Sequence, residues 1–210
     1  NMTRLQTRSH RLVREQLPSQ ILFRDENITL QATGTPPFLL LTQRSLQDRI
    51  YQLTGADWRP LERFEDLLIL KRQQSSHWMG LDLTGASPYA GEVYGDYPRW
   101  WIDPANKKRR RALLLNQGEV WLWDPRLSTT LLWRQAQPLQ NALWHPQGSH
   151  IILADRSRVW AIELDERDGR MVSELGRFDE IHDISLVRQT LYVAGIYQGQ
   201  EGVWSLSIEE

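Results

Sequence analysis

Cysteine is missing from this chain of 210 residues. Its absence excludes a disulfide framework, a thiolate metal site and a cysteine nucleophile. Also missing is any apolar run near the roughly 20 residues that a membrane-spanning helix needs. No charged and then apolar leader opens the chain. Because the sequence begins Asn1-Met2, we expect a longer parent that carries a signal or an anchor upstream.

The chain also has little net charge, since 25 basic residues against 26 acidic ones give a formal net charge of −1. Binding to nucleic acid or to an anionic membrane surface depends on an excess of positive charge. We therefore expect no nucleic-acid partner, and contact with a membrane only through an upstream anchor.

Motifs for catalysis are scarce. The five histidines form no H-x-x-x-H or H-E-x-x-H arrangement. The segment around Ser87 fails the G-x-S-x-G nucleophile pattern at its last position. No Walker loop and no dinucleotide-binding glycine pattern occurs. These absences predict a protein that is not an enzyme and that uses no cofactor or metal ion.

Tryptophan, in contrast, is abundant, with ten residues, and the clearest segment around it runs from Gln140 to Leu164. Three short apolar runs in this segment are separated by a turn with Pro146 and Gly148 and by a polar turn at residues 155–157. Runs of this length between turns are typical of strands. The segment therefore predicts a three-stranded antiparallel meander, to which one more strand would give a propeller blade.

The same pattern repeats along the chain. Trp160 lies in the third run, and the equivalent Trp121 and Trp204 lie 39 residues before and 44 residues after it. Trp78 precedes Trp121 by 43 residues. A period of about 40 to 45 residues with four strands per unit is typical of β-propellers. We predict three regular blades within residues 98–208.

The first hundred residues follow this period less well. Measured between second strands, the spacings of 21 and 29 residues are too short for complete blades. These spacings come from three strand pairs: 21–23 with 28–30, 38–42 with 49–53, and 67–71 with 78–83. We expect abbreviated N-terminal blades, or donation of Ile21 to Phe23 to the last blade, where it would cover an exposed strand edge.

The prediction is thus an all-β fold, a β-propeller of about five four-stranded antiparallel blades with abbreviated N-terminal blades. A polar N-terminal segment covers residues 1–18, and the propeller domain covers residues 19–210. Two incomplete rings closing against each other as a dimer is an alternative that a missing final strand leaves open.

The stretch Trp144 to Leu153, WHPQGSHIIL, resembles the W-x-P-x-G-x-x-I/L repeat of TolB-like and WD-like bacterial propellers. Trp123-Asp124 is similar to the pair that ends a strand in WD repeats, and Val159 to Glu174 resembles the propeller-like C-terminal region of bacterial PEGA-domain surface proteins. The chain has no PEGA motif and no Gly-His pair that opens a WD repeat. The resemblance covers about residues 100–208, and it implies a scaffold at the cell envelope.

Aromatic rings gather in the loop-rich segment Ser87 to Trp101. Aromatic residues on loops are common in binding sites, because a flat ring gives a large contact area at low entropic cost. The predicted contact residues for a protein or glycan are Tyr89, Tyr94, Tyr97 and Trp100. Packing of these rings between blades is the alternative interpretation.

A run of five cations is the strongest charge cluster. It comprises Lys107, Lys108, Arg109, Arg110 and Arg111. Consecutive cations can bind a polyanion, but the run is predicted to lie in the turn between the first and second strands of a blade. In a protein with a net charge near zero, a solvated turn is the simpler interpretation.

Together these features predict a non-enzymatic interaction or scaffold module of the bacterial cell envelope, membrane-anchored in a longer parent, that binds a protein or glycan through rim loops. Two alternatives remain. One is the propeller portion of a larger hydrolase or peptidase, and the other is an intracellular WD-like assembly platform.

Overall fold

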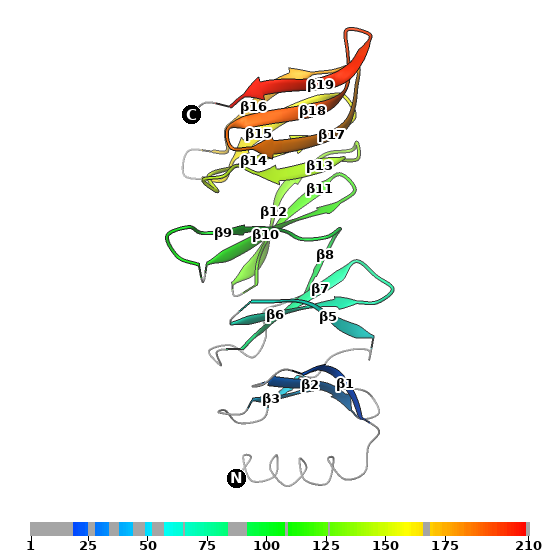
Figure 1. The fold of residues 1–210 in the computed structure, drawn as a ribbon, viewed down its shortest axis with the longest axis vertical. Coiled ribbons are helices and arrows are strands. Elements are labelled where there is room, and N and C mark those ends of the chain that lie inside the picture. The colour runs from blue at the N-terminus through cyan, green and yellow to red at the C-terminus, as the bar shows by residue number, and fades with distance from the viewer. Residues whose placement is uncertain are drawn as a thin grey trace. The chain divides into compact units, whose positions relative to one another are not determined.

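The computed structural model describes residues 19–24, 28–33, 38–43, 49–51, 57–64, 66–83, 92–107, 109–125, 127–165 and 169–208. Within these ranges the regular structure is entirely β (Figure 1). No helix in the described part is long and apolar enough to span a bilayer. The predicted all-β fold class is confirmed. The predicted polar segment 1–18 lies outside the described residues.

The strands form five antiparallel sheets, each following the order of the chain. The first contains β1 (Ser19–Arg24), β2 (Ile28–Thr33), β3 (Phe38–Gln43) and β4 (Arg49–Tyr51). The second contains β5 (Trp58–Arg63), β6 (Leu67–Arg72), β7 (His77–Asp82) and β8 (Glu92–Tyr94). The third contains β9 (Arg99–Ile102), β10 (Arg110–Asn116), β11 (Glu119–Asp124) and β12 (Ser128–Arg134).

The fourth sheet contains β13 (Asn141–Trp144), β14 (His150–Ala154), β15 (Arg158–Glu163) and β16 (Val172–Arg177). The fifth has three strands among the described residues, β17 (Glu180–Val187), β18 (Thr190–Tyr197) and β19 (Gln200–Ser207). A four-stranded antiparallel meander is the blade unit of a propeller, so the five sheets are compatible with the predicted number of blades.

The repeat extends through the N-terminal part as well. The second strands of the five sheets begin at residues 28, 67, 110, 150 and 190, which are 39, 43, 40 and 40 residues apart. The short spacings in the sequence arose because β1–β2 and β3–β4 look like two separate pairs, whereas β2 also pairs with β3. The first two sheets are shortened only in their fourth strands, β4 and β8, which have three residues each.

The predicted donation of Ile21 to Phe23 is corrected by the pairing of β1. This strand pairs antiparallel with β2, as the first strand of its own sheet. Local pairing across a short connection closes at a low entropic cost. Among the described residues the last sheet keeps its three strands without β1.

The chain folds as two compact units, residues 1–92 and 93–210. In the first unit, alternate residues of β2, β6 and β7 form one buried cluster that includes Leu30, Leu68 and Met79. Fully buried Trp58 at the start of β5 belongs to the same cluster. Burial of side chains this large supplies most of the stabilising free energy of such a small unit.

In the second unit the core lies in layers between successive sheets. One cluster joins the third and fourth sheets through residues such as Leu113 of β10 and Leu153 of β14. Another joins the fourth and fifth sheets through residues such as Ile152 of β14 and Val193 of β18. Since Ile152 and Leu153 point to opposite faces of one strand, β14 contributes to both layers.

Two bulges occur at equivalent points of the third and fourth sheets. The register between β11 and β12 shifts at Val120/Trp121, and that between β15 and β16 shifts at Val159/Trp160. In each case the fourth strand has one extra residue there. The strand end beyond the bulge carries an arginine, Arg134 in β12 and Arg177 in β16.

Candidate functional site: a row of loops in the second unit

Six connections lie along one end of the strands of the second unit. In a meander, the turn from the second to the third strand and the link from the fourth strand to the next sheet leave from the same end. We call these connections the loop row: residues 95–98, 117–118, 135–140, 155–157, 178–179 and 198–199.

Backbone hydrogen bonds join the first part of the row. Asp96 N donates to Leu115 O over 2.7 Å, which ties residues 95–98 to the end of β10. Gln135 N donates to Gly118 O and Leu139 N to Gln117 O, over 2.9 and 2.8 Å. The link 135–140 therefore lies against the turn 117–118.

The same pattern continues in the second part. Phe178 N donates to Ser157 O and Asp179 N to Ile196 O, each over 2.8 Å. The Asp179 carboxylate accepts a hydrogen bond from Gly199 N at 2.8 Å. The links 135–140 and 178–179 thus each bond to the turn before them and to the strand end after them, since Gln140 N also donates to Ala154 O at 2.8 Å.

Gly118 is required by the close approach of two loops. A Cβ at this position would overlap the carbonyl oxygen of Gln135. Because that oxygen belongs to the backbone of the next loop, a side chain here would push the two loops apart. The glycine in this turn is therefore a condition for the row to form.

A hollow of about 640 Å³ opens in the middle of the row. We call it the arginine pocket; its lining residues are Gln137, Pro138, Gln140, Asp155, Arg156, Ser157, Arg158, Arg177 and Phe178. Three guanidinium groups line it against a single carboxylate. A smaller hollow of about 380 Å³ adjoins it at Pro138 and is lined in part by Glu119 and Arg134.

The carboxylate of Asp155 is buried, and its hydrogen bonds hold Arg158 in place. One carboxylate oxygen accepts from Ser157 N at 2.9 Å and from Arg158 N at 2.8 Å. The other accepts from Arg158 Nε and Nη2 at 3.1 and 2.7 Å. Burial alone would raise the pKa of Asp155, but the hydrogen bonds from Ser157 and Arg158 lower it below its ordinary value.

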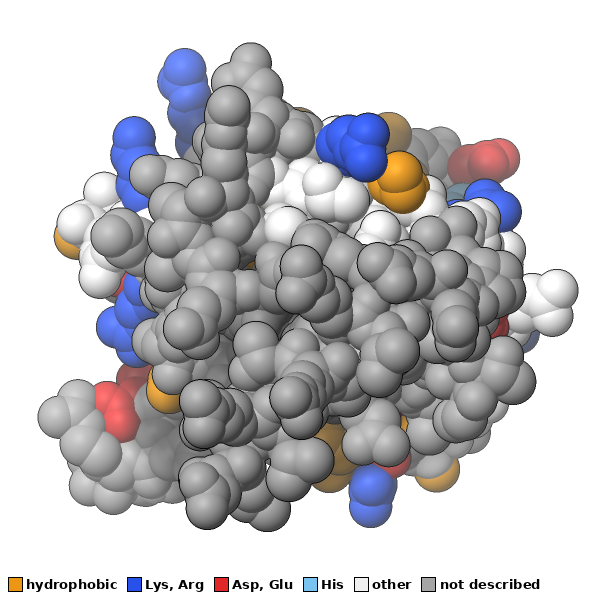
Figure 2. Space-filling model, turned by 90° about the horizontal axis from the view of Figure 1, so that it is seen from below, with side chains coloured by type: hydrophobic (Ala, Val, Ile, Leu, Met, Phe, Trp, Pro, Cys, Tyr) orange, Lys and Arg blue, Asp and Glu red, His pale blue; other side chains and the backbone are white. Residues whose placement is uncertain are grey.

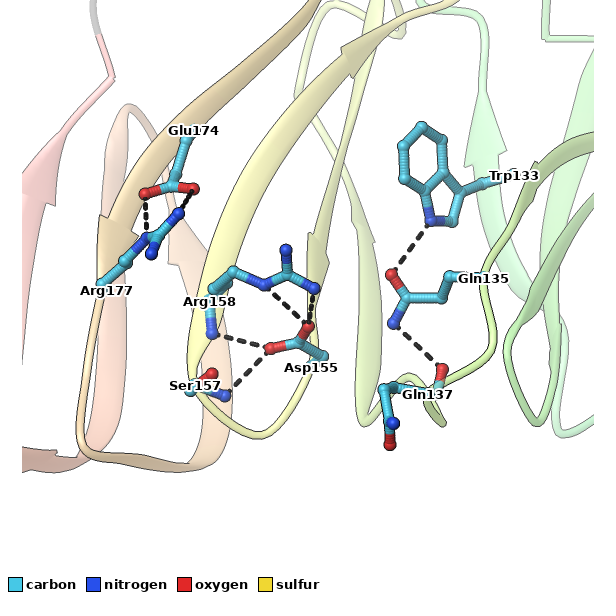
Figure 3. Close-up of polar contacts among 8 residues, drawn as sticks. All are labelled: Trp133, Gln135, Gln137, Asp155, Ser157, Arg158, Glu174 and Arg177. Atoms are coloured by element: carbon cyan, nitrogen blue, oxygen red, sulfur yellow. Dashed lines mark hydrogen bonds and ion pairs between the residues drawn. The ribbon is translucent and has the colours of Figure 1, made fainter.

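The remaining guanidinium nitrogen of Arg158 points away from Asp155 (Figure 3). The Cζ atom of Arg158 lies 5.5 Å from the centre of the Trp160 ring, and this cation–π contact further fixes the arginine side chain. Arg158 is therefore a rigid cation whose position is set before any ligand arrives.

The other two arginines of the pocket are held more loosely. Arg177 forms a two-point pair with Glu174, over 2.6 and 3.0 Å (Figure 3). Hydrogen bonding to Arg177 lowers the pKa of Glu174 and raises that of Arg177. Arg156 reaches Glu180 through one contact of 3.4 Å, and the exposed side-chain fractions of Arg156 and Arg177 are 79% and 71%. Exposed pairs of this kind are weak and exchange readily.

Aromatic and amide groups flank the three arginines. The Phe178 ring lies 5.5 Å from the Tyr197 ring, which lies 5.2 Å from Trp204. On the other side, Trp133 Nε1 donates to the side chain of Gln135, whose amide donates to Gln137 O (Figure 3). Of these groups, Phe178 and Gln137 line the arginine pocket itself.

The predicted aromatic contact residues fall into different places. Tyr94 and Tyr97 are 55% and 59% exposed, and Tyr97 belongs to the loop row. Trp100 is half-buried and packs on Trp123 of the same sheet, with ring centroids 5.5 Å apart. Tyr89 lies outside the described residues. Binding by these residues stays a prediction.

The basic run lies at the other end of the strands: Lys107 and Arg109 are in the turn between β9 and β10, as predicted, whereas Arg110 and Arg111 begin β10. Arg111 is half-buried, with its Cζ 4.8 Å from the Trp101 ring and 5.4 Å from the Trp144 ring. Burial lowers its pKa, and the charge of Arg109 lowers it further.

Arg111 is thus a packing residue, whereas Lys107 and Arg109 are exposed. Arg110 is half-buried, and Lys108 lies outside the described residues. On the face drawn in Figure 2, the lysines and arginines of the described residues stand apart from one another. Polyanion binding by the run stays a prediction.

Within the described ranges no cluster of histidine, aspartate and glutamate has the geometry of a metal site. The row of loops and its pocket were missed at the sequence level, because they depend on contacts between links and turns of neighbouring sheets. One signal was available: Arg134 and Arg177 end equivalent fourth strands, 43 residues apart.

No protein-family model matches the chain, and no curated protein matches it. Solved structures similar to it include Hsv2 of Kluyveromyces lactis, at 11% identity and a TM-score of 0.43, covering 84% of this chain and 57% of that one. The β-propeller domain of Cps50 (Swd1) of Myceliophteria thermophila has 14% identity and a TM-score of 0.39, covering 82% and 64%.

A chain of a nidogen/laminin complex has 10% identity and a TM-score of 0.46, covering 87% and 72%. This chain spans less than two thirds of the first two structures. At such identities and TM-scores these similarities support no statement about function.

Proposed function

We propose that the protein is a non-enzymatic interaction module that binds another protein through the loop row of its second unit. The observation that carries the proposal is the backbone hydrogen bonding along the loop row, together with the arginine pocket in its middle. A surface whose backbone is fixed before binding loses little entropy when a partner arrives. Its exposed arginine and tyrosine side chains are of the kinds enriched in binding hot spots.

Tyr97 extends the proposed surface at one end of the row, and Tyr197 extends it at the other. Tyr94, next to the row, completes the aromatic contacts. Rings of this type combine a large contact area with a polar hydroxyl group.

Placement at a bacterial cell envelope, an upstream anchor and a glycan as the bound partner are finer parts of the proposal. They have their support in the resemblance of residues 100–208 to PEGA-domain and TolB-like propellers. Detection of the protein in a membrane fraction of its own cells, and its release from that fraction by salt or by detergent, would test the location.

Site-specific photo-crosslinking tests the binding surface. A benzophenone amino acid is placed at Gln137 or Tyr97 in the loop row, and at Lys107 or Ser149 at the other end of the strands as matched controls. We expect discrete cross-linked products with proteins of the native cells from the first pair of positions only. Equal products from both pairs, or products from the controls alone, would contradict the proposal.

A further inference from the structure

We propose that the arginine pocket binds an acidic peptide segment of the partner, with a carboxylate of that segment held between Arg158 and Arg177. This inference rests on the proposed function, because it names the chemistry recognised by one part of the loop row. The groups that carry it are Arg156, Arg158, Arg177 and Phe178.

The charge of the pocket wall favours an anion. Three of its nine lining residues are arginines, and its single carboxylate, Asp155, is 4% exposed and already accepts four hydrogen bonds. A ligand carboxylate thus meets guanidinium groups and is shielded from that negative charge. Charge-assisted hydrogen bonds from arginine to carboxylate are among the stronger polar contacts in proteins.

The internal pairs of the pocket set the geometry without using every donor. Arg158 contacts Asp155 through Nε and Nη2, and Arg177 contacts Glu174 through the same two atoms. The other terminal nitrogen of each guanidinium is the donor left for a ligand. Arg156, with its one long contact to Glu180, can turn toward the ligand at little cost.

The rest of the wall suits a peptide better than a free ion. Phe178 and Pro138 offer apolar contact, and the side chains of Gln137 and Gln140 offer donors and acceptors for a peptide backbone. A hollow of about 640 Å³ is large enough for a few residues of an extended chain. The occupant that fits is therefore an acidic side chain next to an apolar one.

Fluorescence anisotropy with a labelled synthetic peptide tests the inference on the full chain. The probe is a short peptide with the core Glu-Glu-Leu-Glu, and its control has glutamine in place of each glutamate. We expect the acidic peptide to bind at least about tenfold more tightly than the control, with an affinity that falls as salt rises. Equal affinity for the two peptides would overturn the inference.

Two double variants locate the binding. Arg156→Glu with Arg177→Glu reverses charge in the pocket, and Arg109→Glu with Arg188→Glu makes the same change in net charge on exposed arginines at the other end of the strands. We expect about tenfold weaker binding in the first variant and an unchanged affinity in the second. Circular dichroism checks that both are folded. Equal effects in the two variants would overturn the assignment.

A variant with increased binding makes the test independent of any loss of fold. Glu174→Gln removes the competitor of the ligand for Arg177, so we expect the acidic peptide to bind about two- to fivefold more tightly. Unchanged or weaker binding would contradict the inference.

A sulfated heparin fragment that competes with the peptide and itself binds more tightly would instead assign the pocket to a polyanion. If the cross-links from the loop row persist while the acidic peptide fails to bind, the inference fails and the proposed function stands.

Discussion

The two ends of the strands in the second unit are held together by different interactions. At the loop row, backbone N–H and C=O groups of successive links and turns bond directly to one another. At the other end, side chains make the connection: Arg111 lies against Trp101 and Trp144, and Trp101 Nε1 donates to Pro146 O at 3.0 Å.

This difference decides which side chains stay exposed at each end of the strands. Where backbone hydrogen bonds join the links to the turns, side chains such as Arg156 and Arg177 are left exposed. Where side chains such as Trp101 and Arg111 join the sheets, those side chains pack against one another and are less accessible. Of the basic run, Arg111 is therefore held by packing, while Lys107 and Arg109 stay exposed.

The largest expected effect comes from breaking the backbone contact in the row. Gly118→Ala places a Cβ on the Gln135 carbonyl oxygen, and we expect a loss of about 3 kcal/mol in the free energy of unfolding, because two loops must move apart. Gly199→Ala is the matched control in another turn of the row: its φ is 75° and an added Cβ meets nothing within 4 Å. It should cost only about 1 kcal/mol. Urea denaturation measures both; equal losses would show that the close approach is unimportant.

A smaller effect is expected from the opposite end. Arg111→Ala removes a half-buried cation from between two tryptophan rings and its hydrogen bond to Gly148 O. We expect unfolding to become easier by about 2 kcal/mol. Arg109→Ala removes the same charge from an exposed position of the same run, and its stability should stay within about 0.5 kcal/mol of the parent. Thermal denaturation that ranks the two variants in the reverse order would contradict the packing role of Arg111.

The smallest effect depends on pH. The pKa of Asp155 is lowered in the folded state from its ordinary 3.8, so its contribution to stability is present above that value and is lost as the pH falls through the folded pKa. Asp155→Asn should therefore lose about 1.5 kcal/mol at pH 7. The difference from the parent should shrink in acid. Urea denaturation at several pH values tests this, and a difference that grows in acid would reverse the assigned direction.

The sequence predicts the strands of this fold better than their grouping. Trp78, Trp121, Trp160 and Trp204 all lie in third strands, as their spacing predicts. The prediction of which strands belong to each of the first two sheets was wrong. A hairpin pattern shows which neighbouring strands pair, but it does not show where one sheet ends and the next begins. The loop row depends on backbone contacts between residues such as Gln135 and Gly118. Glutamine is a common polar residue and glycine has no side chain, so neither stands out in the sequence. No local pattern marks that contact.

The matching bulges of β12 and β16 have a consequence for how such a surface can change over time. The extra residue in each fourth strand shifts the alternation of side chains by one position. Loss of that single residue would move the side chains beyond the bulge to the opposite face of the sheet, so that buried and outward-facing positions would be exchanged. Insertions or deletions of one residue at this point would then change which charged side chains of a blade face the solvent, more than substitutions would. The amino-acid composition of the blade would stay almost the same.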